Sequence, residues 1–345
     1  MSRTKTLHVR EPYRTQILTG RKSIEVRVGY ANILRLEPGD RLRLGEQLVT
    51  ILRIGRYADF EELLAHEDPG AIAPDLPAGD LLATLRQIYP PDKEMLGAVA
   101  LELSPAQRYD AILFDMGYTL IYFDPPQEII VQEALQTLGV DRPVEEINAA
   151  VEVVWGAYYC DAETATFPAT ERYDRESQLA LTKGLLAQLG LDVDSSALQA
   201  YNDAIEASFR RPGVIRPYRE VSEVLASLQA QGYRLGIVSN WSWNLRDRVA
   251  QAGLESFFKV VWASAYAGCN KPHPGIFQQA LAQMDVAADS ALYVGDSYRH
   301  DVVGARNAGL DVVLLDRDGQ VQSPDCPIIR DLCGLFDLLA GEPWT

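Results

Sequence analysis

From Tyr109 onward, short apolar runs alternate with longer amphipathic stretches. The apolar runs are Ala111–Phe114, Leu235–Val238, Val260–Trp262, Leu292–Val294 and Val312–Leu315. Between them, stretches such as Val221–Gln231 and Gly275–Gln283 carry apolar residues at helical spacing. Strands that alternate with helices indicate an α/β fold with a parallel sheet and right-handed crossovers.

Residues 127–211 interrupt this alternation, because they show helical spacing and no strand pattern. A loop of this length is uncommon in a compact domain. We therefore expect an all-helical subdomain over residues 125–214, inserted into a core formed by residues 109–124 and 215–345.

The first hundred residues follow a different pattern, with strands and only short helices. Ser23–Val28 alternates between polar and apolar side chains, as a half-buried strand does. Two more strands are predicted over Arg41–Ile54 and a closing strand over Gly97–Leu103. We expect a separate small β-domain over residues 1–104, followed by a linker at 104–107.

The composition excludes several classes of protein. The chain has 345 residues, 47% of them hydrophobic, which is enough for two buried cores. Its four cysteines lack the spacing of a zinc site or redox pair, so we expect reduced thiols. No apolar run approaches the roughly 20 residues of a membrane span, and the first residues do not resemble a signal peptide. We expect a cytoplasmic protein without a membrane partner.

Charge is distributed unevenly along the chain. The formal net charge is −16, yet residues 1–56 hold twelve basic and five acidic residues, a local net charge of +7. Such a basic segment is either a surface for a phosphate-bearing partner or an ordinary solvated face. The remaining residues are strongly acidic, which argues against extended wrapping of nucleic acid.

Short polar motifs follow the predicted parallel strands, at the edge where open α/β sheets bind ligands. In chain order they are Phe114–Leu120, Val238–Asn240, Lys271–Pro272 and Gly295–Ser297, with Asp301 shortly after. This ordered set resembles the four motifs of the haloacid dehalogenase (HAD) superfamily. The resemblance implies a Rossmann-like parallel-sheet core, and the inserted helices resemble the cap of one HAD subclass.

The HAD resemblance implies a phosphohydrolase with a carboxylate nucleophile. Asp115 matches the nucleophile, which forms an aspartyl-phosphate. A carboxylate that attacks phosphorus needs positive charge nearby. The family pattern places Mg²⁺ on the Asp115 carboxylate, the Gly117 carbonyl, Asp296 and Asp301, which are the oxygen ligands that this ion prefers.

The remaining motif residues match the phosphate-binding groups of the family. Ser239 and the Asn240 backbone are expected to donate hydrogen bonds to phosphoryl oxygens, and Lys271 to neutralise charge. Alone, Lys271 could be a solvated lysine and Ser239 a helix cap. Their occurrence together with the acidic residues favours the catalytic interpretation. We expect His300, beside these motifs, to be an exposed side chain.

One position departs from the family pattern. HAD phosphatases carry a second Asp, the general acid, two residues after the nucleophile, where this chain has Gly117. Loss of such an acid typically costs on the order of 10²–10⁴ in rate. Either the substrate has a good leaving group, as in an anhydride or acyl phosphate, or Tyr118 or Asp124 supplies the proton, or the domain binds phosphate with little turnover. Metal-free dehalogenation is disfavoured by Asp296.

Residues 20–27, Gly-Arg-Lys-Ser-Ile-Glu-Val-Arg, match the G-x-K-x-x-E-x-R pattern of the ASCH domain, a PUA-like β-barrel. The resemblance implies RNA or nucleotide binding, with Lys22, Glu25 and Arg27 as the binding residues. The alternative is a salt-bridge network of the same three side chains with only a structural role.

Together these patterns predict a Mg²⁺-dependent phosphohydrolase for a small phosphorylated metabolite or nucleotide, with an N-terminal RNA- or nucleotide-binding module. The alternative is an RNA- or nucleotide-binding protein whose HAD domain is degenerate. Gly117 is the residue that favours this alternative.

Overall fold

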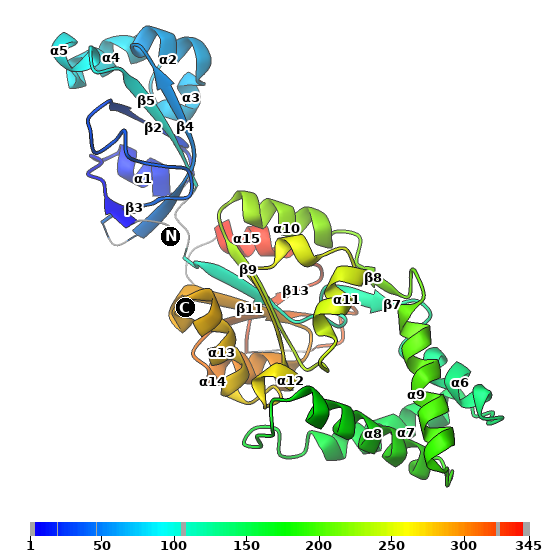
Figure 1. The fold of residues 1–345 in the computed structure, drawn as a ribbon. Coiled ribbons are helices and arrows are strands. Elements are labelled where there is room, and N and C mark those ends of the chain that lie inside the picture. The colour runs from blue at the N-terminus through cyan, green and yellow to red at the C-terminus, as the bar shows by residue number, and fades with distance from the viewer. Residues whose placement is uncertain (1–3, 19, 46, 105–107, 322–324, 341–345) are drawn as a thin grey trace. The chain divides into compact units, whose positions relative to one another are not determined.

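The computed structural model describes residues 4–18, 20–45, 47–104, 108–321 and 325–340. It contains two compact units, one of residues 1–110 with 227–233 and one of residues 111–226 with 234–345. Of the predicted linker at 104–107, only Ser104 lies among the described residues. Each unit has its own sheet (Figure 1).

The N-terminal unit is built on a five-stranded mixed sheet with the order β1-β3-β4-β5-β2. Its strands are β1 (Thr4–Thr6), β2 (Ile24–Val28), β3 (Arg41–Leu44), β4 (Gln47–Tyr57) and β5 (Ala98–Leu103). β1 runs parallel to β3, and the other neighbouring strands are antiparallel. The strands predicted at Ser23–Val28 and Gly97–Leu103 therefore form, as β2 and β5.

Short helices and two apolar clusters complete this unit. The helices are α1 (Tyr13–Leu18), α2 (Phe60–His66), α3 (Pro69–Ile72), α4 (Leu81–Ile88) and α5 (Pro91–Glu94), with a 3₁₀ turn, η1 (Ala78–Asp80). One cluster joins Phe60 of α2 and Leu81 of α4 to Val26. The other joins Ile17 of α1 to Ile51. The sheet thus carries buried apolar side chains in two separate clusters, which explains how so small a unit holds its fold.

The second unit contains a six-stranded sheet, parallel throughout, with the order β10-β9-β6-β11-β12-β13. Its strands are β6 (Ala111–Phe114), β9 (Arg234–Ser239), β10 (Val260–Ala263), β11 (Ala291–Gly295), β12 (Asp311–Leu315) and β13 (Ile328–Ile329). All five apolar runs predicted as strands form. β13 was not predicted, because two residues give no pattern to read. The predicted α/β fold with a parallel sheet is confirmed.

Helices follow the strands of this sheet. They are α10 (Val221–Ala230), α11 (Leu245–Gln251), α12 (Ser264–Ala267), α13 (Pro274–Met284), α14 (Gly304–Asn307) and α15 (Gly334–Ala340). Three short helical turns, η2 (Glu255–Phe257), η3 (Ala288–Ser290) and the π-type η4 (Tyr298–Val303), connect them. Phe277 of α13 and Ala305 of α14 pack with Leu113 and Tyr293 of the two central strands. The central strands β6 and β11 are therefore fully buried.

Four longer helices stand between β7 (Ile121–Phe123) and β8 (Ile215–Pro217), which pair antiparallel (Figure 1). These helices are α6 (Gln127–Thr137), α7 (Val144–Tyr158), α8 (Glu171–Gln188) and α9 (Ser195–Arg210). Leu135, Ile147 and Leu186 form an apolar cluster of their own with Tyr201. The helices predicted over residues 127–211 form. Within the described residues, no helix has both the length and the apolar character needed to cross a membrane.

Candidate active site

The parallel sheet brings the sequence motifs to one edge. β6 ends at Phe114, β9 at Ser239 and β11 at Gly295, and these three strands are neighbours. Because the carboxyl ends of parallel strands lie at the same edge, the residues that follow them meet there. The result is a group of three carboxylates, Asp115, Asp296 and Asp301, whose ligand oxygens lie within 4.8 Å of one another.

Lys271 lies buried among these carboxylates, with 2% of its surface exposed. Its Nζ donates to Asp115 Oδ1 at 2.5 Å and to Asp301 Oδ1 at 2.6 Å. Burial alone would lower the pKa of Lys271, but the two carboxylates raise it overall. Lys271 is therefore a permanent positive charge beside the predicted nucleophile.

The backbone of Lys271 is fixed by the side chain of Asn240. The Lys271 N–H donates to Asn240 Oδ1 at 2.6 Å, and Asn240 Nδ2 donates to the Lys271 carbonyl at 3.1 Å. The side chain of Asn240, rather than its predicted backbone donor alone, thus joins the loops after β9 and β10. Ser239, half of the same motif, is buried, and its hydrogen bond acts to lower the pKa of Asp115.

Tyr293 is a component that the sequence did not reveal. Its hydroxyl lies 2.8 Å from the Val238 carbonyl oxygen and 3.0 Å from Asp301 Oδ1, and it accepts from Lys271 Nζ at 3.1 Å. The phenol therefore holds both the lysine and Asp301 in place. Tyr293 lies within an apolar run that is typical of a buried strand, so the sequence does not distinguish it from an ordinary core residue.

Asp301 is positioned from two sides. Its Oδ2 accepts the Ser297 backbone N–H at 2.9 Å, while Oδ1 takes Lys271. A Cβ on Gly295 would overlap the Asp301 carboxylate, so only glycine allows this approach. Gly295 thus ends β11 and also makes room for an acidic side chain.

The charges in this cluster do not balance. Desolvation by the surrounding cavity, and then repulsion from Asp115 and Asp301, raises the pKa of Asp296 to about 7, although Asp296 is the exposed member of the three. Burial also raises the pKa of Asp115, although Lys271 acts against this. Three carboxylates share one ammonium group, and every atom that these carboxylates could offer to a metal ion is an oxygen. The described residues therefore fit a hard divalent cation such as Mg²⁺, which would relieve this repulsion.

Gly117 lines the same pocket as Asp115. Its φ is not in the left-handed region, and an added Cβ would lie 3.6 Å from Trp241 Cζ3, an ordinary contact. Neither backbone conformation nor packing thus requires glycine here.

The two predicted substitutes for the missing acid are poorly suited to that role. Tyr118 lines the pocket with its hydroxyl 3.3 Å from Gln127 Oε1, and burial raises the pKa of Tyr118 to about 12. Asp124 pairs with Arg216 at 3.0 Å and is not among the described residues that line the pocket. The structure offers no evident proton donor at this position among the candidates that the sequence suggested.

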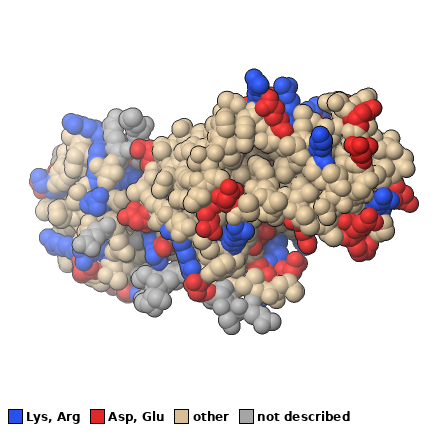
Figure 2. Space-filling view, turned by 90° about the horizontal axis from the view of Figure 1, so that it is seen from below, with Lys and Arg blue, Asp and Glu red and all other residues tan. Residues whose placement is uncertain are grey.

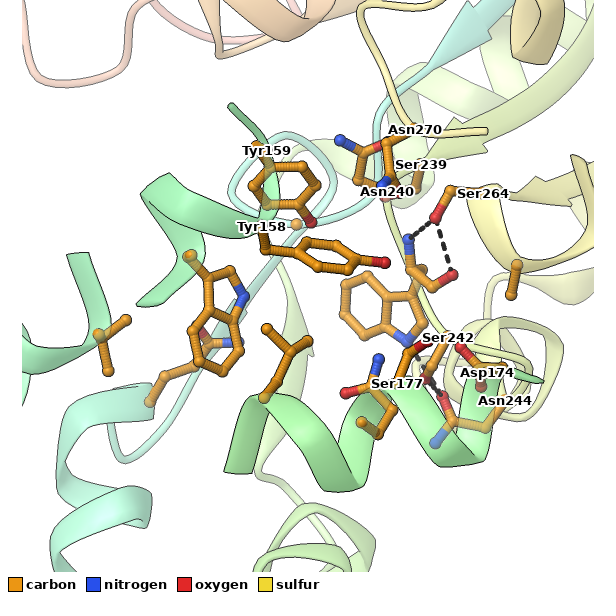
Figure 3. Close-up of a pocket in the computed structure, with 18 of the residues that line it drawn as sticks. Tyr158, Tyr159, Asp174, Ser177, Ser239, Asn240, Ser242, Asn244, Ser264 and Asn270 are labelled. Carbon is orange, nitrogen blue, oxygen red and sulfur yellow. Dashed lines mark hydrogen bonds between the residues drawn. The ribbon is translucent and has the colours of Figure 1, made fainter. Parts of the chain in front are cut away.

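A cavity of about 930 Å³ opens over the carboxylates, lined by the loops after the strands and by helices α6–α9. In Figure 3, Tyr158 and Tyr159 from the helical side lie close to Ser239, Asn240 and Asn270 from the loops after the strands, and all five line this cavity.

The prediction that His300 is exposed is wrong. It lines the cavity, its ring is tilted against that of Tyr159 with the centroids 5.2 Å apart, and its Nδ1 lies 3.3 Å from Ser297 Oγ. His300 lies in the irregular turn η4, which directs its side chain into the cavity. Strand and helix patterns in the sequence do not specify that direction.

Lys22, Glu25 and Arg27 lie together in the N-terminal unit, as predicted from their spacing. Glu25 pairs with Lys22 at 3.3 Å and with Arg27 at 2.7 Å. Lys22 is 4% exposed, and its Nζ also donates to the carbonyls of Ile24 and Ile72. Burial lowers the pKa of Lys22. These contacts are those of the structural salt-bridge network.

The basic character of residues 1–56 is balanced within the same unit. Residues 57–110 contain eleven acidic and three basic residues, so residues 1–110 carry a net charge near −1. Arg21 pairs with Asp75 and Arg53 with Glu67, each at 2.6 Å. The face of the protein in Figure 2 likewise shows acidic and basic side chains mixed.

Comparison with known proteins finds relatives of the second unit. The family profile of "haloacid dehalogenase-like hydrolase" matches residues 170–315. Over these residues the chain is similar to the HAD-superfamily hydrolases. A phosphoserine phosphatase of Thermus thermophilus is 28% identical over 62% of this chain and 91% of its own length. A glyceraldehyde 3-phosphate phosphatase of Methanothermobacter thermautotrophicus is 31% identical over 36% of this chain and 60% of its own.

Solved structures agree with the fold. The HAD hydrolase YfnB of Bacillus subtilis, solved with magnesium bound, has a TM-score of 0.55 at 22% identity, covering 68% of this chain and 99% of its own. The L-2-haloacid dehalogenase RSc1362 has a TM-score of 0.52 at 20% identity, with the same coverage. At these identities the likeness concerns the fold alone. The phosphatase relatives and the family match together support a HAD-like phosphatase as the enzyme class.

Removal of divalent cations is expected to make stability depend on pH. The pKa of Asp296 is raised to about 7, so between about pH 4 and pH 7 the native state binds more protons than the unfolded state. The free energy of unfolding should therefore fall as pH rises through this range, and level off above it. Urea denaturation in EDTA at pH 5 and pH 7.5 measures this, and saturating Mg²⁺ should restore stability at pH 7.5. Asp296→Asn should remove most of this pH dependence of stability. An unchanged pH dependence in this variant would contradict its attribution to Asp296.

Gly295→Ala is expected to destabilise the protein by about 1–3 kcal/mol, because the new methyl group would overlap Asp301. It should also weaken Mg²⁺ binding, measured by calorimetry, since Asp301 must move. Gly156→Ala is the matched control: Gly156 lies in α7 with nothing within 4 Å of an added Cβ. That change should be neutral or slightly stabilising. Equal effects of the two substitutions would show that Gly295 has no special role.

Proposed function

We propose that this protein is a Mg²⁺-dependent phosphohydrolase that acts through an aspartyl-phosphate at Asp115 on a small phosphorylated metabolite or nucleotide. The observation that carries the proposal is the buried contact of Lys271 with both Asp115 and Asp301, beside Asp296. The relatives named as phosphatases of phosphoserine and of glyceraldehyde 3-phosphate support a small substrate.

In the proposed mechanism, an Asp115 oxygen attacks phosphorus, and the leaving oxygen departs with the electron pair of the broken bond. Lys271 keeps Asp115 ionised and offsets the negative charge of the phosphoryl group. Ser239 and the Asn240 backbone donate to the phosphoryl oxygens. Mg²⁺, held by Asp115, Asp296, Asp301 and the Gly117 carbonyl, would supply further charge neutralisation. Water then cleaves the aspartyl-phosphate, which releases phosphate and restores the carboxylate.

The domain organisation forms part of the proposal. Residues 109–124 with 215–345 act as the HAD core, and residues 125–214 act as a helical cap over it. Support for a cap comes from the cavity, whose walls include α7, α8 and α9 as well as the catalytic loops. Such a cap would exclude water from the aspartyl-phosphate and select the substrate.

Residues 1–104 are proposed to be an ASCH-type, PUA-like module that binds RNA or a nucleotide. Arg27 is the residue that favours this, because its Nε is buried and has no hydrogen-bond partner among the described residues. Its guanidinium otherwise contacts Glu25, the His8 carbonyl and the Tyr89 hydroxyl. A ligand oxygen at Nε would complete its hydrogen bonding.

A second candidate is a nucleotide- or RNA-binding protein whose HAD domain turns over little substrate. Gly117 favours it, since the position lacks an acid and the candidates Tyr118 and Asp124 do not replace one. Phosphatase activity that depends on Asp115 would separate the two.

Asp115→Asn tests the nucleophile. We expect hydrolysis of p-nitrophenyl phosphate and acetyl phosphate with Mg²⁺ to fall by on the order of 10³-fold or more, because the covalent route is lost. Asp124→Asn is the matched control, since Asp124 pairs with Arg216 away from the cavity, and its activity should stay close to wild type. Equal residual activity in wild type and Asp115→Asn would refute the nucleophile and favour the binding protein.

Arg27→Gln tests the N-terminal module. Binding is measured by fluorescence anisotropy with a short labelled RNA, competed by free nucleotides, across a salt series. The variant should bind about tenfold more weakly, and the slope of log binding constant against log salt concentration should be smaller by about one. Arg86→Gln in the same unit is the control, because Arg86 is an exposed partner of Glu94 and Glu61. If both variants bind like wild type, Lys22, Glu25 and Arg27 form only a structural network.

A further inference from the structure

Aromatic side chains dominate the cavity walls near the nucleophile. On the core side, Tyr118 contacts Phe123 at 5.8 Å, and Phe123 stacks on Trp241 at 6.3 Å. On the helical side, Tyr158 and Tyr159 form an edge-to-face pair at 4.9 Å. All five line the same cavity as Asp115. A flat, apolar group attached to the phosphate would therefore meet aromatic side chains from both the core and the helices.

The cavity offers little positive charge beyond the phosphate position. Lys271 and Arg248 are the Lys and Arg residues among its described lining residues. Lys271 is bound to Asp115 and Asp301. Arg248 is almost fully buried, pairs with Glu206 at 2.6 Å and lies over a phenylalanine ring. Neither cation is available to a second anionic group of a substrate.

Further acidic side chains line the cavity, besides the partners of Lys271 and Arg248. Glu128, Asp174 and Asp203 line it, and Asp174 accepts the Trp243 backbone N–H at 2.9 Å. His300 also lines the cavity, with its Nδ1 3.3 Å from Ser297 Oγ. A carboxylate on the leaving group would meet repulsion and lose its hydration without compensation.

The chemistry of the leaving group also favours an aromatic substrate. With Gly117 in the acid position, the leaving oxygen must depart with little help from a proton donor. An alkoxide is a poor leaving group, because the pKa of its conjugate acid lies near that of water, far above that of a phenol. A phenolate is far better, since phenols such as tyrosine have a pKa of about 10.

We propose that this site selects phosphate monoesters of aromatic hydroxyl groups that carry no second anion near the ring. The proposal rests on the proposed function and names its substrate class. Asp115 displaces the phenolate, which takes the electron pair of the P–O bond and a proton from solvent. Water then cleaves the aspartyl-phosphate to give inorganic phosphate. The ring of the substrate lies between the Tyr158–Tyr159 pair and Trp241.

The test compares phenyl phosphate with phosphoserine, using the full chain and Mg²⁺. We expect kcat/KM for phenyl phosphate to exceed that for phosphoserine by at least about 100-fold, from ring contacts and leaving-group chemistry together. Asp115→Asn, which cannot turn over, should also bind phenyl phosphate more tightly than phosphoserine by calorimetry. Phosphoserine equal to or better than phenyl phosphate in either measurement would overturn the substrate class while leaving the phosphohydrolase intact. No hydrolysis above Asp115→Asn with any substrate would instead refute the proposed function.

Two variants separate the contribution of leaving-group chemistry from that of the ring contacts. Gly117→Asp supplies an acid, so it should raise kcat for phosphoserine at least tenfold more than kcat for phenyl phosphate. Tyr158→Leu should lower the ratio of kcat/KM for phenyl phosphate to that for acetyl phosphate about tenfold, mainly through KM. Val153→Ala is its control on the same helix, exposed and outside the cavity lining, and should leave the ratio unchanged. An unchanged ratio in Tyr158→Leu, or equal gains for both substrates in Gly117→Asp, would count against the aromatic preference.

Discussion

The structure of the second unit depends on a buried lysine between two carboxylates. The carboxylates of Asp115 and Asp301 stabilise the charge of Lys271 inside the protein, and the Lys271 ammonium in turn offsets the negative charge that the two acids bring together. The surrounding features hold this arrangement together: Asn240 fixes the lysine backbone, Tyr293 contacts the ammonium, and Gly295 leaves space for Asp301. One ammonium cannot balance three acids, and this imbalance is the reason that the site suits the divalent cation we propose.

The N-terminal unit contains a second buried lysine with a different outcome. Lys22 has one carboxylate partner, Glu25, and otherwise contacts the carbonyls of Ile24 and Ile72. Carbonyl dipoles offset burial less well than full negative charges, so the pKa of Lys22 falls while that of Lys271 rises. A side chain held in this way supports the fold around it and is poorly placed to meet a ligand, which leaves Arg27 as the better candidate.

Sequence patterns predicted the sheet well, because each strand of a buried parallel sheet is a continuous apolar run. They also brought the motif residues to one edge, since parallel strands end together. They did not separate Tyr293 from its apolar neighbours, because a phenol in a strand looks like core until its hydroxyl is placed. They misjudged His300, whose direction depends on one turn of irregular helix. They also offered Asp124 as one candidate proton donor, and only the tertiary structure shows it paired with Arg216.

The open space beside Gly117 has a consequence for how this protein could change over time. Two of the four glycine codons differ from an aspartate codon by a single nucleotide, and neither backbone nor neighbour opposes the larger side chain here. The acid could therefore be gained or lost in one mutational step without disturbing the fold. Selection on the reaction itself, rather than on folding, would then decide which residue stands at this position.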